Sequence, residues 1–209
     1  MMQTLDISTE VSFSPLLHRY TLEEFWTLPE PEDRSHYELI GGYLFMVPPP
    51  APPHGSIDAR LIRSLMQFLI EHKIQGEVHH PREPIYRHEK GGTYLEPDMM
   101  YVSDELRDRM GQKRTSADIV FEYLSESTAI YDRTTKAHTY LALGVRELWI
   151  IDQVGQTIEV RHAAEHGNQP AWEICSYCIG EWAESRVLDG WRVSVGDLLE
   201  GLQGHIQPE

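Results

Sequence analysis

The sequence predicts an α/β or α+β fold in which helices cover a mixed β-sheet. Residues 56–73 carry apolar side chains at the spacing of a long amphipathic helix, and residues 131–143 show helical periodicity that ends at Gly144. Residues 119–124 and 148–151 are strongly apolar runs of strand length. Long helices and strands that alternate in one chain indicate a sheet with helices packed against it.

The length and composition are typical of a globular protein. The chain has 209 residues, of which 41% are hydrophobic and 24% charged, enough for one domain with a substantial core. We expect a loose segment at residues 1–18, which show no clear periodicity, and a single domain over residues 19–209. No apolar run approaches the ~18 residues of a membrane span and no signal-peptide pattern is visible, so we expect a cytoplasmic protein without a membrane partner.

Turn and capping signals define the other elements. Gly41-Gly42 separates two apolar runs and predicts a β-hairpin. Five prolines within residues 48–53 predict an extended linker, because proline lacks the donor that helices and strands need. Thr21 and Ser103 are candidate helix N-caps. In chain order, the sequence predicts a helix near 21–26, strands 37–40 and 43–47, a helix 56–73, strands 77–80, 84–86 and 94–102, a helix 103–110, a strand 119–124, a helix 131–143, a strand 148–151, short strands within 156–195 and a helical turn near 197–202.

The net charge of −15, from 18 basic and 33 acidic side chains, restricts the partners of the protein. Nucleic-acid affinity depends largely on Lys and Arg side chains that neutralise phosphates, and an acidic surface on average repels phosphates. Any binding to DNA therefore has to come from a local basic patch, from metal ions or from a partner, and we expect it to be weak.

Two carboxylates stand where core residues are expected. Asp98 lies in the predicted strand 94–102, and Glu122 lies in the apolar strand 119–124. Burial of a carboxylate is unfavourable unless it is paired or binds a cation, and two close carboxylates raise each other's pKa, an effect that a divalent cation reverses. Hard oxygen ligands suit Mg²⁺ or Mn²⁺ better than zinc, so Asp98 and Glu122 predict a site for one of these ions.

A positively charged side chain follows one element later. Asp132 and Lys136 are four residues apart on the predicted helix, with Tyr140 one turn further on the same face. Taken alone, an exposed ion pair is the simpler explanation of Asp132 and Lys136, but Glu122 within an apolar strand has no comparable explanation. Arg133 is a second candidate cation. Lysine is preferred because its pKa falls when it is desolvated beside a metal, whereas arginine stays protonated.

Six fragments occur in a specific order over roughly residues 20–162. They are Tyr37-Glu-Leu-Ile-Gly-Gly42, Pro50 to Gly55 ending in His-Gly, Pro97-Asp98 with its apolar continuation, Asp118-Ile-Val-Phe-Glu-Tyr-Leu-Ser125 followed by Ser127-Thr128, Asp132 with Lys136 and Tyr140, and Gly144-Val-Arg-Glu-Leu-Trp-Ile-Ile-Asp152. In this order and spacing they resemble the Uma-two family of endonucleases, within the PD-(D/E)XK superfamily. The resemblance implies a restriction-endonuclease-like fold, a mixed central β-sheet flanked by α-helices. It also implies a metal bound by Asp98, Glu122 and the backbone carbonyl of Tyr123.

The chain departs from the family pattern at two positions. The lysine of the plain superfamily motif stands two residues after the glutamate, and Leu124 occupies that position here. Lys136 is the natural substitute, because its helix directly follows the Glu122 strand and its long side chain can reach back over the site. Glu126 stands where the family usually has a proline between two serines, and it adds negative charge near the site.

Two further residues have alternative interpretations. Glu38 in the N-terminal hairpin is either an additional metal ligand or an exposed strand residue. His54 either lines the site or has a structural role at the entry of the helix.

The residues and the resemblance together imply an endonuclease that hydrolyses phosphodiester bonds in DNA with Mg²⁺ or Mn²⁺. Asp98, Glu122 and Lys136 would be its catalytic residues. The cation would polarise the phosphate and lower the pKa of a water, and Lys136 would position or help deprotonate that water and stabilise negative charge. The alternative is a non-cleaving nucleic-acid-binding or regulatory protein that keeps the fold, and the acidic surface favours it.

The C-terminal third carries two motifs of other kinds. His162-Ala-Ala-Glu-His166 matches a zinc-hydrolase pattern, but that pattern requires a helix, and here it follows a strand-like segment, which favours a hairpin. Cys175 and Cys178 lie in a strand-like segment that would place their thiols on opposite faces, so we expect two reduced structural cysteines.

The same third of the chain predicts self-association. It is rich in aromatic side chains, with Trp172, Trp182 and Trp191. Because aromatic residues are enriched at protein interfaces, we expect a homodimer, although buried core tryptophans explain the same pattern.

Overall fold

The computed structural model describes residues 18–50, 53–125 and 127–201. Most of the segment expected to be loose, residues 1–17, therefore lies outside the described residues. So do residues 51–52 of the proline-rich linker, Glu126, and the end of the helical turn predicted near 197–202.

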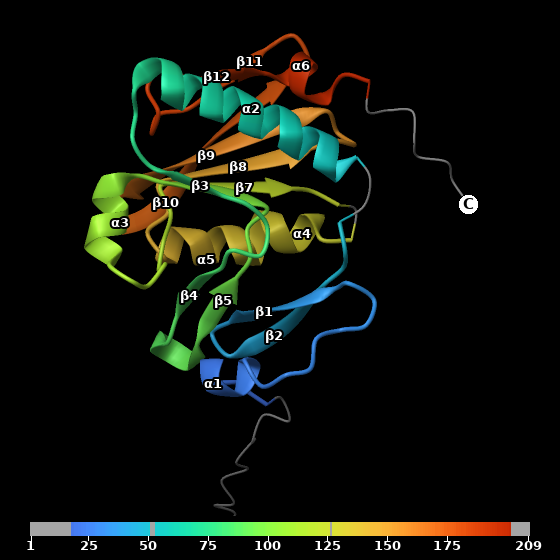
Figure 1. The fold of residues 1–209 in the computed structure, drawn as a ribbon, viewed down its shortest axis with the longest axis vertical. Helices are drawn as coiled ribbons and strands as arrows, with labels where there is room; N and C mark the ends of the chain where they lie inside the picture. Colours follow the sequence, from blue (N-terminus) through green and yellow to red (C-terminus); the bar gives the residue numbers. More distant parts are fainter. Residues whose placement is uncertain (1–17, 51–52, 126, 202–209) are drawn as a thin grey trace, which may run out of the picture.

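The described chain forms three β-sheets with helices between and beside their strands (Figure 1). In chain order the elements are α1 (Leu22–Phe25), β1 (His36–Ile40), β2 (Tyr43–Val47), α2 (His54–His72), β3 (Glu77–His79), β4 (Ile85–Arg87), the 3₁₀-helix η1 (Glu89–Gly91), β5 (Thr93–Leu95), β6 (Met99–Val102), α3 (Asp104–Met110), β7 (Ile119–Tyr123), α4 (Ala129–Tyr131), the π-helix η2 (Asp132–Lys136), α5 (Ala137–Ala142), β8 (Glu147–Asp152), β9 (Thr157–His166), β10 (Gln169–Cys178), β11 (Trp182–Glu184), β12 (Arg192–Ser194) and α6 (Val195–Leu199). None of the described helices is long and apolar enough to cross a membrane.

The central sheet has six strands in the order β10-β9-β8-β7-β6-β3. Strands β7 and β8 are parallel, and every other neighbouring pair in this sheet is antiparallel, so the predicted mixed sheet is confirmed. A parallel pair needs a crossover connection, and here α4, η2 and α5 supply it. This crossover holds the helical segment with Lys136 against the sheet.

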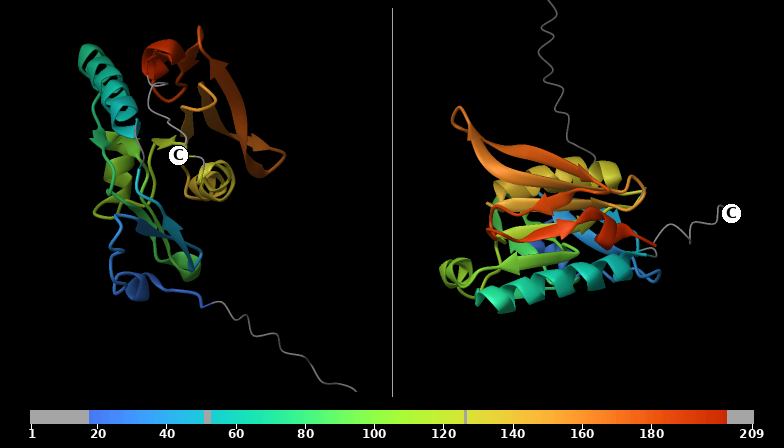
Figure 2. Two further views of the ribbon diagram at one scale, coloured as in Figure 1. Left: turned by 90° about the vertical axis from the view of Figure 1, so that its right-hand side faces the viewer. Right: turned by 90° about the horizontal axis from the view of Figure 1, so that it is seen from above.

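Helices cover both faces of the central sheet, as the left view of Figure 2 shows for α2 and α5. Leu61 and Leu65 of α2 pack with Phe121 of β7 and Trp149 of β8 in one apolar cluster. On the other face, α5 packs in a second cluster that includes Val120 of β7. Because side chains alternate along a strand, successive residues of β7 face different helices.

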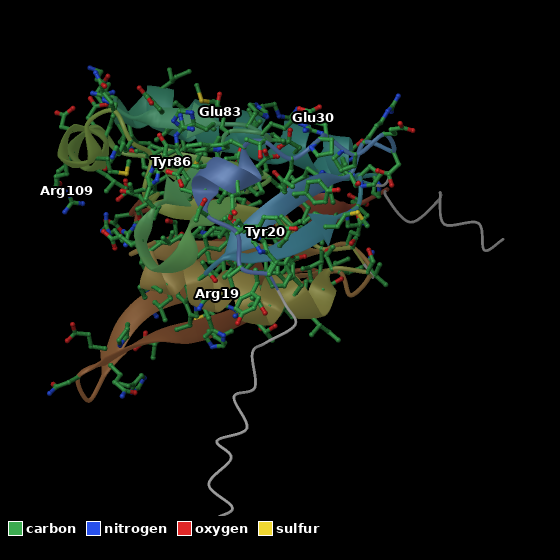
Figure 3. All side chains as sticks on the ribbon, turned by 90° about the horizontal axis from the view of Figure 1, so that it is seen from below. Arg19, Tyr20, Glu30, Glu83, Tyr86 and Arg109 are labelled. Atoms are coloured by element: carbon green, nitrogen blue, oxygen red, sulfur yellow. The ribbon has the colours of Figure 1, made fainter. Side chains whose placement is uncertain are left out.

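A smaller four-stranded sheet, in the order β2-β1-β5-β4, lies below α4 and α5 in Figure 1. The predicted hairpin is confirmed, and the φ angles of +57° at Gly41 and +86° at Gly42 fit the two-residue turn that joins its strands. Short helix α1 begins with the predicted capping box at Thr21. Seen from below in Figure 3, Tyr20 and Tyr86 lie beside α1, and both pack against the apolar cluster of Leu22, Phe25 and Leu39.

The predicted strands differ from the structure in two regions of the chain. The single strand predicted over residues 94–102 is two strands, β5 and β6, which belong to different sheets. Glu96-Pro97-Asp98 separates them, and Pro97 has no N–H to continue a ladder. The short strands predicted after residue 156 include two of ten residues each, β9 and β10. The right view of Figure 2 shows the end of the β9–β10 hairpin extending beyond the rest of the molecule.

Candidate active site

Glu122 lies within the central strand β7, between the neighbouring strands β6 and β8. It faces the α5 side of the sheet, in alternation with Phe121 and Tyr123, and it is buried. The phenol of Tyr140 on α5 donates a hydrogen bond of 2.5 Å to Glu122 Oε1. The prediction of a carboxylate buried in an apolar strand is therefore confirmed.

Lys136 is buried against this carboxylate. Its Nζ lies 2.8 Å from Glu122 Oε1, 3.2 Å from Glu38 Oε1 and 3.9 Å from Asp132 Oδ1. Only 3% of the Lys136 residue surface is exposed, and Asp132 is buried as well. The interpretation of Asp132 and Lys136 as an exposed ion pair on a wet helix is therefore wrong.

The helix that carries Lys136 is not a regular α-helix. The predicted helix over residues 131–143 is a π-helical turn, Asp132–Lys136, between the short α4 and α5. The N–H of Ala137 donates to the carbonyl of Asp132, five residues back. A π-turn widens the helix and changes the direction of the side chains around it, and such turns are frequent at functional sites.

Glu38 of β1 is fully buried, with 0% of its surface exposed, so the interpretation as an exposed strand residue is wrong. Its Oε1 accepts a hydrogen bond of 2.9 Å from the N–H of Glu96 and contacts Lys136 Nζ. Its Oε2 accepts a hydrogen bond of 2.9 Å from the hydroxyl of Tyr131. No sequence pattern indicates this role for Tyr131, because one tyrosine near a helix start has no distinctive spacing.

Asp98 lies directly before β6 rather than inside a strand. The register pairs Met99 with Phe121, so Asp98 comes next to Glu122 at the end of the ladder. Its Oδ2 accepts a hydrogen bond of 2.7 Å from the N–H of Tyr123. Its side chain is 22% exposed, which makes it the most accessible acid of the group.

His54, at the first turn of α2, contacts the other oxygen of Asp98. The distance from His54 Nε2 to Asp98 Oδ1 is 3.2 Å, and the ring meets Tyr123 edge-on at 4.7 Å between centroids. Burial alone would lower the pKa of His54, but the neighbouring Asp98 outweighs it and raises this pKa. Of the two interpretations of His54, the structure supports a residue that lines the site.

The electrostatics of the buried group are unbalanced. Three buried carboxylates, Glu38, Glu122 and Asp132, face the single ammonium of Lys136. Burial raises the pKa of Glu122 well above its ordinary value although Lys136 opposes the change, and burial raises the pKa of Asp132 as well. Burial would lower the pKa of Lys136, but Glu122 and Glu38 raise it, so the ammonium stays charged.

A cavity of about 70 Å³ opens beside these residues. One water molecule needs on the order of 10–15 Å³ of cavity volume, so this cavity has room for a cation with a few waters. Asp98, Glu122, Asp132 and Lys136 line the cavity, and Glu38 does not.

The acidic side chains at this cavity fit a hard divalent cation, because carboxylate oxygens are hard ligands and carry negative charge. Within the described ranges, no three His, Cys, Asp or Glu side chains converge as a metal cluster. A ligand set of two carboxylates and one backbone carbonyl, as expected for Asp98, Glu122 and Tyr123, does not need a third acidic side chain.

Arg133, the second candidate cation, points away from Glu122. Its guanidinium lies 3.0 Å from Asp152 Oδ2 and 3.9 Å from Glu159 Oε2. Of the two cations on this helix, Lys136 is therefore the one that contacts the buried carboxylates.

The other two motifs lie in the β9–β10 hairpin. The histidines His162 and His166 both belong to β9, and four residues of strand separate them by about 13 Å, too far to share a metal through this motif. The hairpin expected after them is confirmed. Cys175 and Cys178 are free cysteines on β10. They are three residues apart, so their side chains point to opposite faces of the strand.

The mixed sheet, the helices on both of its faces and the acidic residues at the end of β7 define a restriction-endonuclease-like protein. The chain matches the model of the Uma2 (Uma-two) family, described as "Putative restriction endonuclease", over residues 22–207. It belongs to this family, and the resemblance seen in its sequence is confirmed. No curated protein matches the chain.

A crystal structure from Anabaena variabilis, described as a "putative nuclease belonging to DUF820", is similar in fold. The TM-score is 0.65 and the sequence identity 20%, and the match covers 86% of this chain and 97% of that chain. At this level of identity the likeness supports the restriction-endonuclease-like fold alone.

Proposed function

We propose that this protein is a divalent-metal-dependent endonuclease that hydrolyses phosphodiester bonds in DNA. The observation that carries the proposal is the excess of acidic side chains at the cavity, where Asp98, Glu122 and Asp132 line the wall together with one ammonium group, that of Lys136. Family membership places the chain among nuclease-like proteins, and the charge excess gives this particular chain a reason to bind a cation.

Asp98, Glu122 and the backbone carbonyl of Tyr123 would hold Mg²⁺ or Mn²⁺. Glu122 Oε1 is held by Lys136 and Tyr140. Asp98 Oδ2 accepts a hydrogen bond from the N–H of Tyr123, and Asp98 Oδ1 lies 3.2 Å from His54 Nε2. In the described structure, the polar contacts of Glu122 involve Oε1 alone, which leaves Oε2 for a ligand. When bound, the cation would supply Lewis acidity toward a phosphate oxygen and lower the pKa of a water.

Lys136 would act as a fixed positive charge. Because Glu122 and Glu38 raise its pKa, the ammonium remains a hydrogen-bond donor and does not accept a proton from water. This favours charge stabilisation over the alternative role of assisting deprotonation. Its three N–H groups allow it to contact a phosphate oxygen while it keeps the contact with Glu122.

A non-cleaving nucleic-acid-binding or regulatory protein is the second candidate, and the net charge of −15 favours it. A surface that repels phosphates slows association with DNA, and cleavage needs repeated association. Under this alternative the fold and the cation site remain, but no bond is broken.

Incubation of the purified protein with supercoiled, linear and single-stranded DNA, with and without Mn²⁺, separates the two functions. We expect metal-dependent cleavage that Asp98→Asn and Glu122→Gln abolish, together with loss of Mn²⁺ binding in calorimetry. Glu147→Gln is a matched control, because Glu147 is as deeply buried as Glu122. Glu147 lies at the start of β8, opposite Ile119 and away from Glu122, and its Oε1 accepts a hydrogen bond from Trp149.

Three outcomes have different meanings. Cleavage that both site variants retain would refute the assignment of these residues. Mn²⁺ binding without cleavage of any DNA would support the non-cleaving alternative. Neither cleavage nor Mn²⁺ binding by the unaltered protein would contradict the metal site itself.

A further inference from the structure

The catalytic lysine proposed above reaches the site from a helix, not from the strand of Glu122. A lysine on the strand would be positioned by the hydrogen-bond ladder of the sheet. Lys136 instead ends a π-turn and extends a flexible four-carbon stem into the space between α5 and β7. A long side chain of this kind needs a fixed partner if its ammonium is to keep one position.

Glu38 has the contacts of such a partner. It is fully buried, and its Oε1 lies 3.2 Å from Lys136 Nζ, on the same ammonium that contacts Glu122 at 2.8 Å. Glu38 belongs to the four-stranded sheet and Glu122 to the six-stranded sheet, so the ammonium of Lys136 is bound by carboxylates from two separate sheets. The hydroxyl of Tyr131 fixes the second oxygen of Glu38.

Glu38 itself is held rigidly. It lies in the middle of β1, an inner strand of the small sheet, between β2 and β5. The N–H of Glu96 donates to Glu38 Oε1 and thereby connects it to the segment that leads to Asp98. Both oxygens of Glu38 are occupied by protein groups, and Glu38 does not line the cavity at which Asp98 and Glu122 meet.

We infer that Glu38 is a positioning residue for Lys136 and not a ligand of the metal. This inference rests on the proposed function of Lys136. The small sheet thus has a defined part in the site: it carries, on β1, the carboxylate that holds the ammonium of Lys136 beside Glu122.

Two substitutions of Glu38 test the role. Glu38→Gln keeps the size of the side chain and an acceptor for the Glu96 N–H but removes the negative charge beside Lys136. Glu38→Asp keeps the charge but withdraws it from the ammonium by one methylene. Glu147→Gln is the matched control, because it also replaces a fully buried glutamate, at a distance from the site.

Three measurements apply to each variant: the Mn²⁺ affinity by calorimetry, kcat and KM for DNA cleavage, and the NMR signal of the Lys136 Cε in protein labelled with [6-¹³C]lysine. The chain has four lysines, and loss of one signal in Lys136→Met identifies the resonance. This last measurement requires neither activity nor metal.

A positioning role predicts that kcat falls on the order of 100-fold in Glu38→Gln with little change in KM, because small misplacements of a catalytic group have effects of that size. Glu38→Asp should also lose activity, and both variants should shift the Lys136 signal. Mn²⁺ affinity should fall much less in Glu38→Gln than in Asp98→Asn, since only a nearby charge is lost, not a ligand. Glu147→Gln should lower the melting temperature without changing kcat or the Lys136 signal.

A loss of Mn²⁺ affinity in Glu38→Gln as large as that in Asp98→Asn would overturn the inference and make Glu38 a ligand. An unchanged Lys136 signal in both Glu38 variants would overturn it as well. If the unaltered protein does not cleave DNA, the proposed function fails, while the NMR signal and the Mn²⁺ affinity still decide whether Glu38 positions Lys136. If Glu38→Gln does not fold, Glu38→Asp provides the same three measurements.

Discussion

Replacement of Lys136 by methionine tests the buried charge network directly. Methionine fills nearly the same volume without the ammonium, so the main loss is the pair of contacts at 2.8 Å to Glu122 and 3.2 Å to Glu38. Removal of one partner from a buried ion pair destabilises a protein by about 3–5 kcal/mol. We expect the lower end, about 3 kcal/mol, because burial already favours protonation of Glu122, and a proton can replace the lost charge.

For a chain of this length, a loss of about 3 kcal/mol corresponds to a decrease in melting temperature of roughly 6–12 °C. Calorimetric or circular-dichroism melting of metal-free Lys136→Met measures it. Lys113→Met is the control, because Lys113 is exposed. The double variant Lys136→Met, Glu122→Gln should recover part of the loss, since it removes one of the uncompensated carboxylates.

Mn²⁺ should affect this variant more than the unaltered protein. Lys136 occupies one oxygen of Glu122, so its removal exposes negative charge that a cation can neutralise, and Mn²⁺ should raise the melting temperature of Lys136→Met by a larger amount. Cleavage should fall by about 10²–10³-fold, as for loss of a group that stabilises charge in the transition state. A metal-free melting temperature within about 1 °C of the unaltered protein would refute the reasoning, because a wet surface pair contributes only a few tenths of a kcal/mol.

Three other predictions concern the whole molecule. Duplex DNA should bind weakly and with steep salt dependence, because the protein has a net charge of −15 and on average repels phosphates. Tight binding with a flat salt dependence would contradict this prediction. The pKa values of Glu122 and Asp132 are raised in the folded state. At a pH above 4.5, the ordinary pKa of glutamate, the folded state therefore binds more protons than the unfolded state. Metal-free stability should therefore fall as the pH rises through this window, with a smaller slope in Glu122→Gln, as melting at several pH values will show. A homodimer remains a prediction. Of the three tryptophans on which it was based, Trp182 is exposed, at 47%, and Trp191 is buried. A monomeric mass in light scattering at micromolar concentration would count against a dimer.

The elements predicted best are those with strong local signals. The Gly41-Gly42 turn determines the hairpin, because both positions have positive φ. The apolar stripe predicted over residues 56–73 corresponds to one continuous helix, His54–His72. Glu122 was identified for a similar reason, since an acid among Val, Phe and Leu contrasts with its neighbours within one short strand. In each case the relevant interaction lies within a few residues of the signal.

The features that the sequence did not show depend on distant contacts. The division of residues 93–102 between two sheets depends on which strands are available for pairing, since β5 pairs with β1 and β4, and β6 pairs with β3 and β7. The burial of Glu38 has the same origin. An alternating strand pattern predicts which residues share a face, but it does not predict that Tyr131, 93 residues later, covers that face.

The position of the lysine also affects how the site forms. Leu124, at the position where the plain motif has its lysine, is buried on the α5 face of the sheet, next to the layer that contributes Lys136. Glu122 and Lys136 therefore meet only when α4, η2 and α5 pack onto β7, whereas a lysine on the strand would be in place once the strand had formed. The crossover that makes β7 and β8 parallel is the same segment that delivers Lys136. Loosening of this helical layer should separate the ammonium from both carboxylates at once, so the integrity of the site is tied to the packing of that layer and not to β7 alone.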